Sequence, residues 1–269
     1  MTSYALMRSP AEYDRLRDQA RLWETATARL LDRIGLAAGS RCLDAGCGPG
    51  ETLRLLAHRV GPTGRVTGLD SDAGLVATTR AMLEADGHRT CRVLEHDVTA
   101  DEDLPGGPYD LVFARLLLFH LPQRVEVLAR LWSAVAPGGH LVVQDYDLPT
   151  ARCVPPAPGV DEVAALVNTI FGALGCDVQA GPQLPTFLAA AGAGEPDGAD
   201  VSGLLLPLSQ GAEMLGQVLG SLLPAAVPRG LLTAEQGETA LAGLAKEAES
   251  DPTRPMLWPL MVGIWKTKP

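Results

Sequence analysis

The fold of this chain is decided by residues 43–50, Leu43-Asp44-Ala45-Gly46-Cys47-Gly48-Pro49-Gly50. A short strand-like segment, residues 41–44 (RCLD), leads into this loop, and residues 51–59 leave it with helical spacing. Glycines between a strand and a helix let the backbone turn sharply and let a ligand approach main-chain atoms closely. The stretch therefore predicts the first strand–loop–helix unit of an α/β sheet, with a ligand bound at the loop.

Further strand-like segments follow the loop and alternate with helical ones; they span residues 65–70, 91–97, 109–114 and 140–145. This alternation predicts right-handed crossovers and a parallel sheet. Residues 201–208 and 260–266 predict two later strands, and a helical pattern covers residues 9–34. Because ligands of such sheets bind outside the carboxyl ends of the strands, the residues that follow each strand are the candidates for function.

A single domain, residues 1–269, accommodates all these elements. We expect a helical cap over residues 1–35 and a cofactor-binding core over residues 36–150. The C-terminal half, residues 151–269, is expected to contain a helical insertion at residues 211–255.

The composition excludes several classes of partner. The chain has 32 Asp and Glu against 22 Lys and Arg and lacks a cluster of basic residues, so neither nucleic acid nor an anionic membrane is an expected partner. The five cysteines form no C-x-x-C pair, which favours reduced thiols over a disulfide or zinc framework, and no metal site is expected. The sequence shows no signal-peptide pattern and no membrane-length apolar run, so we expect a cytoplasmic protein.

The glycine loop differs from the dinucleotide pattern G-x-G-x-x-G. Its glycines follow G-x-G-x-G, and Pro49 removes an N–H where a phosphate would need a donor. Asp44 would repel a pyrophosphate but could bind a cationic amine or sulfonium. Asp70 closes the second strand, where it can accept both ribose hydroxyls, and Asp97 closes the third, where it can accept from the amine of adenine. Taken singly, Asp44 and Asp70 could instead cap the helices that follow them.

Several segments resemble the class I S-adenosylmethionine (SAM)-dependent methyltransferases, in particular the small-molecule, ubiquinone-biosynthesis-like branch. They are Leu43–Gly50 (LDAGCGPG), Gly68–Asp70 (GLD), His96–Val98 (HDV), Tyr109–Arg115 (YDLVFAR) and Pro137–Asp145 (PGGHLVVQD). Their order and spacing match the family over more than half of the chain. The resemblance implies SAM as the cofactor. It also implies a Rossmann-like, doubly wound, seven-stranded and mostly parallel sheet with a helical cap, in which the last strand, residues 260–266, is antiparallel.

The resemblance further implies which residues contact the cofactor. In chain order these are Tyr13, Gln19, Asp44, Gly46, Cys47, Gly48, Asp70, Ser71, Asp97, Val98 and Arg115. The loop would wrap the methionine part, and Asp70 and the residues after it would hold the ribose and border the adenosine. Asp97 and the amide of Val98 would bind adenine, and the carbonyl near Arg115 would meet the methionyl amine. The N-terminal helix would close over the cofactor.

The methyl acceptor is expected to bind after the fourth strand. His120 lies there and is the candidate general base, with helix capping as the alternative. Residues 115–119 read Arg-Leu-Leu-Leu-Phe, without the Asn/Asp-Pro-Pro-Tyr turn typical of methyltransferases that act on nucleobase and amide nitrogens. An apolar acceptor is therefore favoured. Asp145, Tyr146 and Asp147 end the fifth strand and could also line the pocket.

The insertion at residues 211–255 carries Met214, Leu215 and further apolar residues at helical spacing. Such a stripe is too apolar to face water unaided. It can be part of the core, a dimer surface or a cover for the acceptor pocket, and we expect the cover, formed together with the N-terminal helix.

These patterns predict a SAM-dependent methyltransferase that transfers a methyl group to an O, N or C atom of a small, largely apolar acceptor, a secondary metabolite. A family member that uses the same site for a cyclisation or rearrangement would carry the same motifs, as would a non-catalytic SAM-binding protein. A monomer or a homodimer is expected.

Overall fold

The computed structural model describes residue 6 and residues 9–269, so part of the expected cap at residues 1–35 lies outside the described residues. Seven strands form the main sheet in the order β3-β2-β1-β4-β5-β10-β7. Their bounds are β1 Arg41–Ala45, β2 Arg65–Asp70, β3 Cys91–Glu95, β4 Tyr109–Arg115, β5 Val135–Asp147, β7 Gly198–Ser202 and β10 Leu260–Thr267. The first five strands are parallel, and β10 runs antiparallel to both β5 and β7. The predicted seven-stranded sheet with an antiparallel last strand is confirmed.

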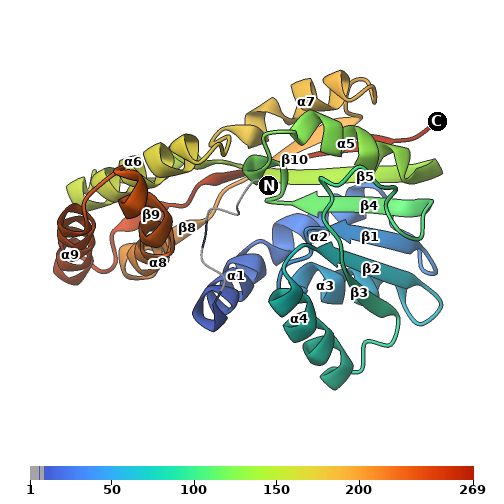
Figure 1. The fold of residues 1–269 in the computed structure, drawn as a ribbon, viewed down its shortest axis with the longest axis horizontal. Coiled ribbons are helices and arrows are strands. Elements are labelled where there is room, and N and C mark those ends of the chain that lie inside the picture. The colour runs from blue at the N-terminus through green and yellow to red at the C-terminus, as the bar shows by residue number, and fades with distance from the viewer. Residues whose placement is uncertain (1–5, 7–8) are drawn as a thin grey trace.

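Helices cover both faces of this sheet (Figure 1). One face carries α2 Glu24–Arg33, α3 Glu51–Val60 and α4 Ala73–Ala85, and the other carries α5 Arg124–Ser133 and α7 Ala180–Ala190. Because side chains alternate along a strand, Leu111 and Phe113 pack on the first face and Val112 and Ala114 on the second. This alternation gives a doubly wound α/β fold with two apolar layers.

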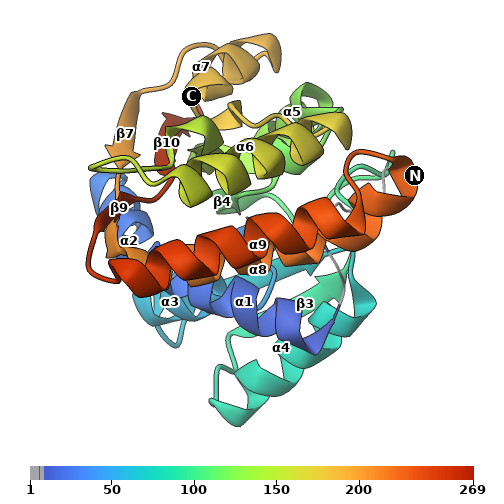
Figure 2. The ribbon, with the colours of Figure 1, turned by 90° about the vertical axis from the view of Figure 1, so that its left-hand side faces the viewer.

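A second helical layer lies beyond the carboxyl ends of the parallel strands (Figures 1 and 2). It consists of α6 Pro158–Ala173, α8 Leu208–Ala226 and α9 Ala234–Ser250, which pack on one another. A small antiparallel sheet, β6 Arg152–Cys153, β9 Pro255–Leu257 and β8 Leu205–Pro207, supports these helices. The cap helix α1 Pro10–Leu22 runs alongside this layer, so ligand groups at the strand ends are enclosed from two sides.

Two sequence expectations are wrong in detail. The helical pattern at residues 9–34 is two helices that break at Trp23, which is fully buried and whose indole Nε1 donates to Tyr146 Oη at 2.7 Å. The strand expected at residues 201–208 is split between β7 in the main sheet and β8 in the small sheet. The chain leaves the main sheet between them, where the Leu204 carbonyl accepts from the Trp258 amide at 2.9 Å. A side-chain hydrogen bond of Trp23 thus accompanies the first break, and a backbone hydrogen bond to Trp258 accompanies the second.

No helix within the described part of the chain is both long and apolar enough to cross a membrane.

Candidate functional site

A cavity of about 280 Å³ opens at the carboxyl ends of β1, β2 and β4, between the main sheet, the cap helix α1 and the second helical layer. Every residue that the sequence predicted to contact the cofactor lines it, as does the candidate base His120. These residues are Tyr13, Gln19, Asp44, Gly46, Cys47, Gly48, Asp70, Ser71, Asp97, Val98, Arg115 and His120. The structure therefore brings together residues that are more than 100 positions apart in the chain.

The glycine loop forms the floor of the cavity between β1 and α3. Gly46 and Gly48 have φ angles of 71° and 52°, a left-handed backbone that favours glycine, and the Gly46 and Cys47 amides both donate to the Leu69 carbonyl. A Cβ on Gly46 would meet the side chain of Leu117 at 3.0 Å. The thiol of Cys47 faces β2 and packs in the cluster around Leu53, so Cys47 offers the cavity its backbone.

Asp44 places a buried carboxylate at the end of β1. Its Oδ2 atom has no hydrogen-bond partner among the residues that the structure describes. Burial raises the pKa of Asp44 to about 7, although the charge of Arg115 opposes this shift. The helix-cap alternative is wrong here, because the N-cap residue of α3 is Gly50 and no side chain caps this helix. An unpartnered buried carboxylate oxygen fits a ligand that carries a positive charge.

Asp70 ties the glycine loop to the turn that follows β2. Its Oδ2 accepts from the Gly48 amide at 2.9 Å and its Oδ1 accepts from the Asp72 amide at 3.0 Å. Capping of α4 belongs to Asp72, which accepts from the Gly74 and Leu75 amides. The cap alternative for Asp70 is therefore wrong, and its carboxylate faces the cavity beside the exposed Ser71.

The third acid, Asp97, lies two residues beyond the end of β3. Its Oδ1 accepts from both the amide and the hydroxyl of Thr99, at 2.9 and 2.7 Å, and neither of these bonds uses Oδ2. Val98 is buried beside it, and its carbonyl accepts from Arg130 at 2.5 Å. His96 lines the same end of the cavity, and its buried Nε2 has no hydrogen-bond partner in the described chain. This end offers hydrogen-bonding groups to a flat polar ring.

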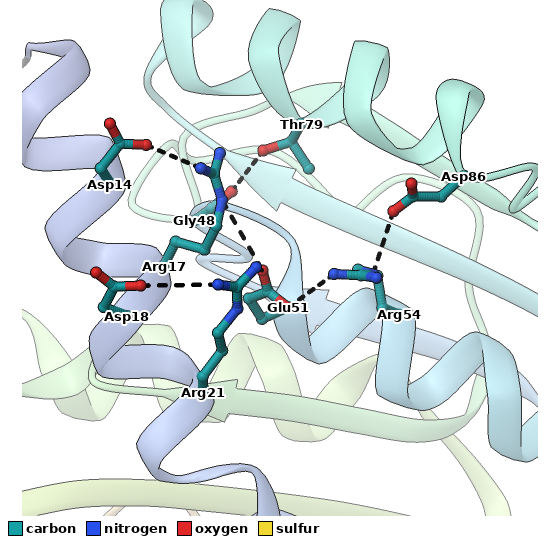
Figure 3. Close-up of polar contacts among 9 residues, drawn as sticks. All are labelled: Asp14, Arg17, Asp18, Arg21, Gly48, Glu51, Arg54, Thr79 and Asp86. Carbon is teal, nitrogen blue, oxygen red and sulfur yellow. Dashed lines mark hydrogen bonds and ion pairs between the residues drawn. The ribbon is translucent and has the colours of Figure 1, made fainter.

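The cap helix α1 is held over the glycine loop by ion pairs to Glu51, the first residue of α3 (Figure 3). The Glu51 carboxylate lies 3.9 Å from Arg17 and 3.3 Å from Arg21 of α1, and 3.2 Å from Arg54 of its own helix. At the other end of α1, the Tyr13 hydroxyl donates to Asp72 at 3.1 Å. The sequence did not single out Glu51, since a charged first residue is common in helices.

Tyr146 lines the cavity and connects the cap helix to the sheet through hydrogen bonds. It lies at the end of β5, and its hydroxyl accepts from Trp23 at 2.7 Å, from Trp258 at 3.2 Å and from Gln19 at 3.3 Å. These donors come from the cap helix, the loop before β10 and the break between α1 and α2. Because they meet at one oxygen, Tyr146 fixes the cap relative to the sheet.

Arg115 closes β4 on the inner wall. Its Nη1 donates to Thr27 at 2.9 Å, and burial lowers its pKa while the charge of Asp44 opposes that shift. The next residue, Leu116, has a φ of 54°, which is strained for a leucine. This strained turn aims the chain toward the far end of the cavity.

His120 occupies that far end, at the close of the 3-10 turn η1 Leu118–His120. Burial, with the nearby charge of Arg15, lowers the pKa of His120 to about 3. The Phe119 ring lies 4.6 Å and the Phe171 ring 6.2 Å from the imidazole, centroid to centroid. Asp145, which the sequence allowed as a pocket residue, lies outside the cavity and beneath the turn, where its Oδ2 accepts from the Phe119 amide at 3.1 Å.

The second helical layer closes the far end with apolar side chains. Those that line the cavity are Ala164, Val167 and Phe171 of α6 and Leu215 and Val218 of α8. The cover expected at residues 211–255 thus contributes Leu215, whereas Met214 packs on the neighbouring core and does not line the cavity. Asn168 and Trp258 line the same region and were missed, because no local pattern predicts which side of a distant helix faces a pocket.

Groups of three or more His, Cys, Asp or Glu side chains that could hold a metal ion do not occur among the described residues.

The strand order, the antiparallel β10 and a glycine loop with acids at successive strand ends define the fold of a class I methyltransferase. The family model described as a methyltransferase domain matches residues 42–139. The trans-aconitate 2-methyltransferase of Paracidovorax citrulli is 36% identical over 158 residues, 58% of this chain and 56% of that protein. A SAM-dependent methyltransferase from Aquifex aeolicus has a TM-score of 0.56 at 16% identity and covers 97% of this chain and 99% of its own. The [4+2]-cyclase SpnF has a TM-score of 0.52 at 17% identity, with coverage of 91% and 80%.

Residues 42–139 of this chain are thus a methyltransferase domain with the class I fold, and SAM is the cofactor of such domains. The chain spans about half the length of the curated relatives it matches, 56% for the protein from P. citrulli. The matched domain ends at residue 139, before the second helical layer that closes the far end of the cavity. The matched domain therefore indicates the cofactor, whereas the helices that close the far end of the cavity, where the acceptor would bind, lie outside it.

Proposed function

We propose that this protein is a SAM-dependent methyltransferase that acts on a small, neutral and largely apolar acceptor. The observation that carries the proposal is the buried Oδ2 of Asp44, which has no hydrogen-bond partner among the described residues and belongs to a side chain at the glycine-loop end of the cavity. The other end of the cavity is lined by apolar side chains. Burying a carboxylate without a partner is costly unless a cation reaches it. The ammonium or sulfonium of SAM is such a cation, and the acids at the next strand ends suit its ribose and adenine.

The chain's own residues would hold the cofactor in one orientation. Asp44 and the loop bind the methionine part, Asp70 accepts from the ribose hydroxyls, and Asp97 with Val98 borders adenine. Tyr13 and Gln19 of the cap helix would cover it, because both side chains already bond across the cavity, to Asp72 and Tyr146. When bound, SAM supplies an electrophilic methyl group on its sulfonium.

Methyl transfer needs the acceptor atom aligned behind that methyl group in a site without water. Phe119, Phe171, Leu215 and Trp258 give the far end of the cavity a rigid, apolar wall. Such a wall favours a carbon-rich acceptor, and a secondary metabolite is part of the proposal.

The charge balance of the cavity disfavours an anionic acceptor. Among its described lining residues only two side chains carry a full positive charge, Arg15 and Arg115, against five acids. Arg15 is paired with the buried Glu12 through two contacts, at 2.5 and 2.9 Å. A tricarboxylate such as the acceptor named for the P. citrulli relative would meet mostly negative charge here. We therefore propose a neutral acceptor for this chain.

His120 suits orientation of the acceptor better than proton removal. A pKa of about 3 keeps the imidazole neutral at neutral pH, so it can accept a hydrogen bond. The same low pKa makes it a weak base, whereas efficient general bases have a pKa near the working pH. The proposal thus favours acceptors that react as neutral amines or as hydroxyls that His120 positions.

A second candidate function is a cyclisation or rearrangement in the same cavity. One observation favours it, the weak basicity of His120. The [4+2]-cyclase SpnF has a similar fold, so the fold is compatible with both chemistries.

Incubation of the protein with methyl-labelled SAM and a panel of amines, phenols and polyketides tests the proposal, with trans-aconitate as the anionic control. We expect label and the mass of one methylene to appear on a neutral acceptor, and trans-aconitate to stay unmodified. A product of unchanged mass would support the second candidate. Methylation of trans-aconitate alone would contradict the neutral-acceptor proposal.

A further inference from the structure

The acceptor chamber, the far end of the cavity lined by Phe119, Phe171, Leu215 and Trp258, also contains the polar side chain of Asn168. Asn168 lies on α6, between the apolar lining residues Val167 and Phe171, and it lines the cavity. Its amide oxygen Oδ1 is buried and makes no hydrogen bond within the described chain. Buried amide oxygens in folded proteins are nearly always paired, so an unpaired one at a ligand cavity needs an explanation.

Other polar side chains that line the cavity bond elsewhere and do not supply a partner for Asn168 Oδ1. The Tyr146 hydroxyl is engaged by Trp23, Trp258 and Gln19, and the Arg15 guanidinium bonds to Glu12 and Gln19. The Nδ1 of His120 lies 3.9 Å from the sulfur of Cys176. These contacts tie the cap helix and the η1 turn together, and none of them involves Asn168, a residue that lines the cavity with its apolar neighbours Val167 and Phe171.

We propose that Asn168 is the specificity-determining residue of the acceptor site and accepts a hydrogen bond from an N–H or O–H group of the acceptor. This inference rests on the proposed function and narrows its substrate class to apolar molecules that carry at least one such donor. A site built to bond a donor rejects an analogue that lacks it, because the buried acceptor atom then stays unpaired.

The chain offers a direct probe, because Asn168 is its only asparagine. Labelling with ¹⁵N-asparagine gives one side-chain amide signal, which NMR can follow during titration. Two fragment pairs differ in the donor while keeping a similar shape: indole against benzofuran, and phenol against toluene. Each is titrated into the full-length protein with and without S-adenosylhomocysteine.

In the wild type we expect indole and phenol to bind about tenfold more tightly than their partners and to shift the Asn168 amide signal. Asn168→Leu keeps the side-chain shape but removes the amide, and should reduce the preference to less than about twofold. Because the variant loses an unpaired buried oxygen, its melting temperature without ligand should rise by about 2 °C or more. Thr169→Val is the matched control, since Thr169 is exposed on the same helix and bonds to the Ala165 carbonyl. It should retain the wild-type preference.

Three results would overturn the inference: failure of the donor fragments to bind, an equal preference in the wild type and Asn168→Leu, or a variant that melts at a lower temperature with its preference intact. The last result would make Asn168 a structural residue. Loss of SAM binding with the donor preference retained would instead refute the proposed function and leave the role of Asn168 standing.

Discussion

Replacing Asp44 by Asn should weaken the binding of SAM and reduce the dependence of this binding on pH. In the free protein burial raises the pKa of Asp44 to about 7, so near neutral pH the carboxyl is only partly ionised. The cationic end of SAM requires the ionised form, and binding therefore pulls a proton off Asp44. Cofactor affinity is linked to this proton in the same way that stability is linked to a shifted pKa.

The size of the effect follows from the pKa. With a value of about 7, the ionised fraction of Asp44 falls from roughly 0.9 at pH 8 to roughly 0.1 at pH 6, which weakens wild-type binding about tenfold, or about 1.4 kcal/mol. Asp44→Asn loses a charge-assisted hydrogen bond and should bind about 1.5–3 kcal/mol more weakly than the wild type at pH 8. Its shape is retained, so the loop around Gly46 should stay in place.

Titration calorimetry at pH 6, 7 and 8 measures both quantities, in pairs of buffers that differ in ionisation enthalpy. The amine of SAM titrates with either protein, so the difference between wild type and variant is the quantity to compare. We expect release of about half a proton at pH 7 in the wild type and less in Asp44→Asn. Asp110→Asn, at the opposite end of the sheet, is the control and should resemble the wild type. Equal affinities and equal pH profiles for wild type and Asp44→Asn would refute the reasoning.

Three further changes test other parts of the site. Asp70→Ala should weaken SAM binding by about 2–4 kcal/mol, because the ribose loses a charged acceptor; a variant that binds normally in calorimetry would reduce Asp70 to a support of the loop. Leu215→Gln should slow acceptor turnover while the dissociation constant for SAM changes less than about twofold. Met214→Gln, whose residue lies outside the cavity, should resemble the wild type. Equal effects of both changes would show that α8 is only part of the core. Asp145→Asn should make the free energy of unfolding less dependent on pH. Burial raises the pKa of Asp145 to about 7, above its ordinary value of 3.8. The protonated carboxyl therefore stabilises the folded wild type at low pH, and up to about 4 kcal/mol of the free energy of unfolding is lost between pH 4 and 7. Thermal melts between pH 4 and 7 would contradict this expectation if the melting temperatures of the wild type and Asp145→Asn changed equally with pH.

The cofactor end could be predicted from the sequence because it follows a rule of the fold. Parallel strands place their carboxyl ends at one edge, so Asp44, Asp70 and Asp97 were expected together before any contact was known. The glycine spacing and Pro49 selected the kind of ligand for the same local reason. The structure adds what local patterns cannot give, such as the assignment of the α4 cap to Asp72.

The acceptor end could be predicted only as apolar. Asn168 and Trp258 reach the cavity through packing of α6 and the small sheet, and a helical sequence pattern does not say which neighbour covers which face. The break at Trp23 has the same origin, since a buried hydrogen bond to Tyr146 overrides a continuous helical pattern. His120 was expected near the acceptor, but its low pKa depends on burial that the sequence does not show.

A crystal structure of the protein with S-adenosylhomocysteine would show whether the three strand-end acids hold the cofactor. We expect the ligand ammonium within hydrogen-bonding distance of Asp44 Oδ2, the ribose hydroxyls on Asp70 and the adenine beside Asp97 and Val98. The chamber between Phe171, Leu215 and Asn168 would then stay open for the acceptor. A ligand bound elsewhere, or one that leaves Asp44 Oδ2 without a partner, would contradict this expectation.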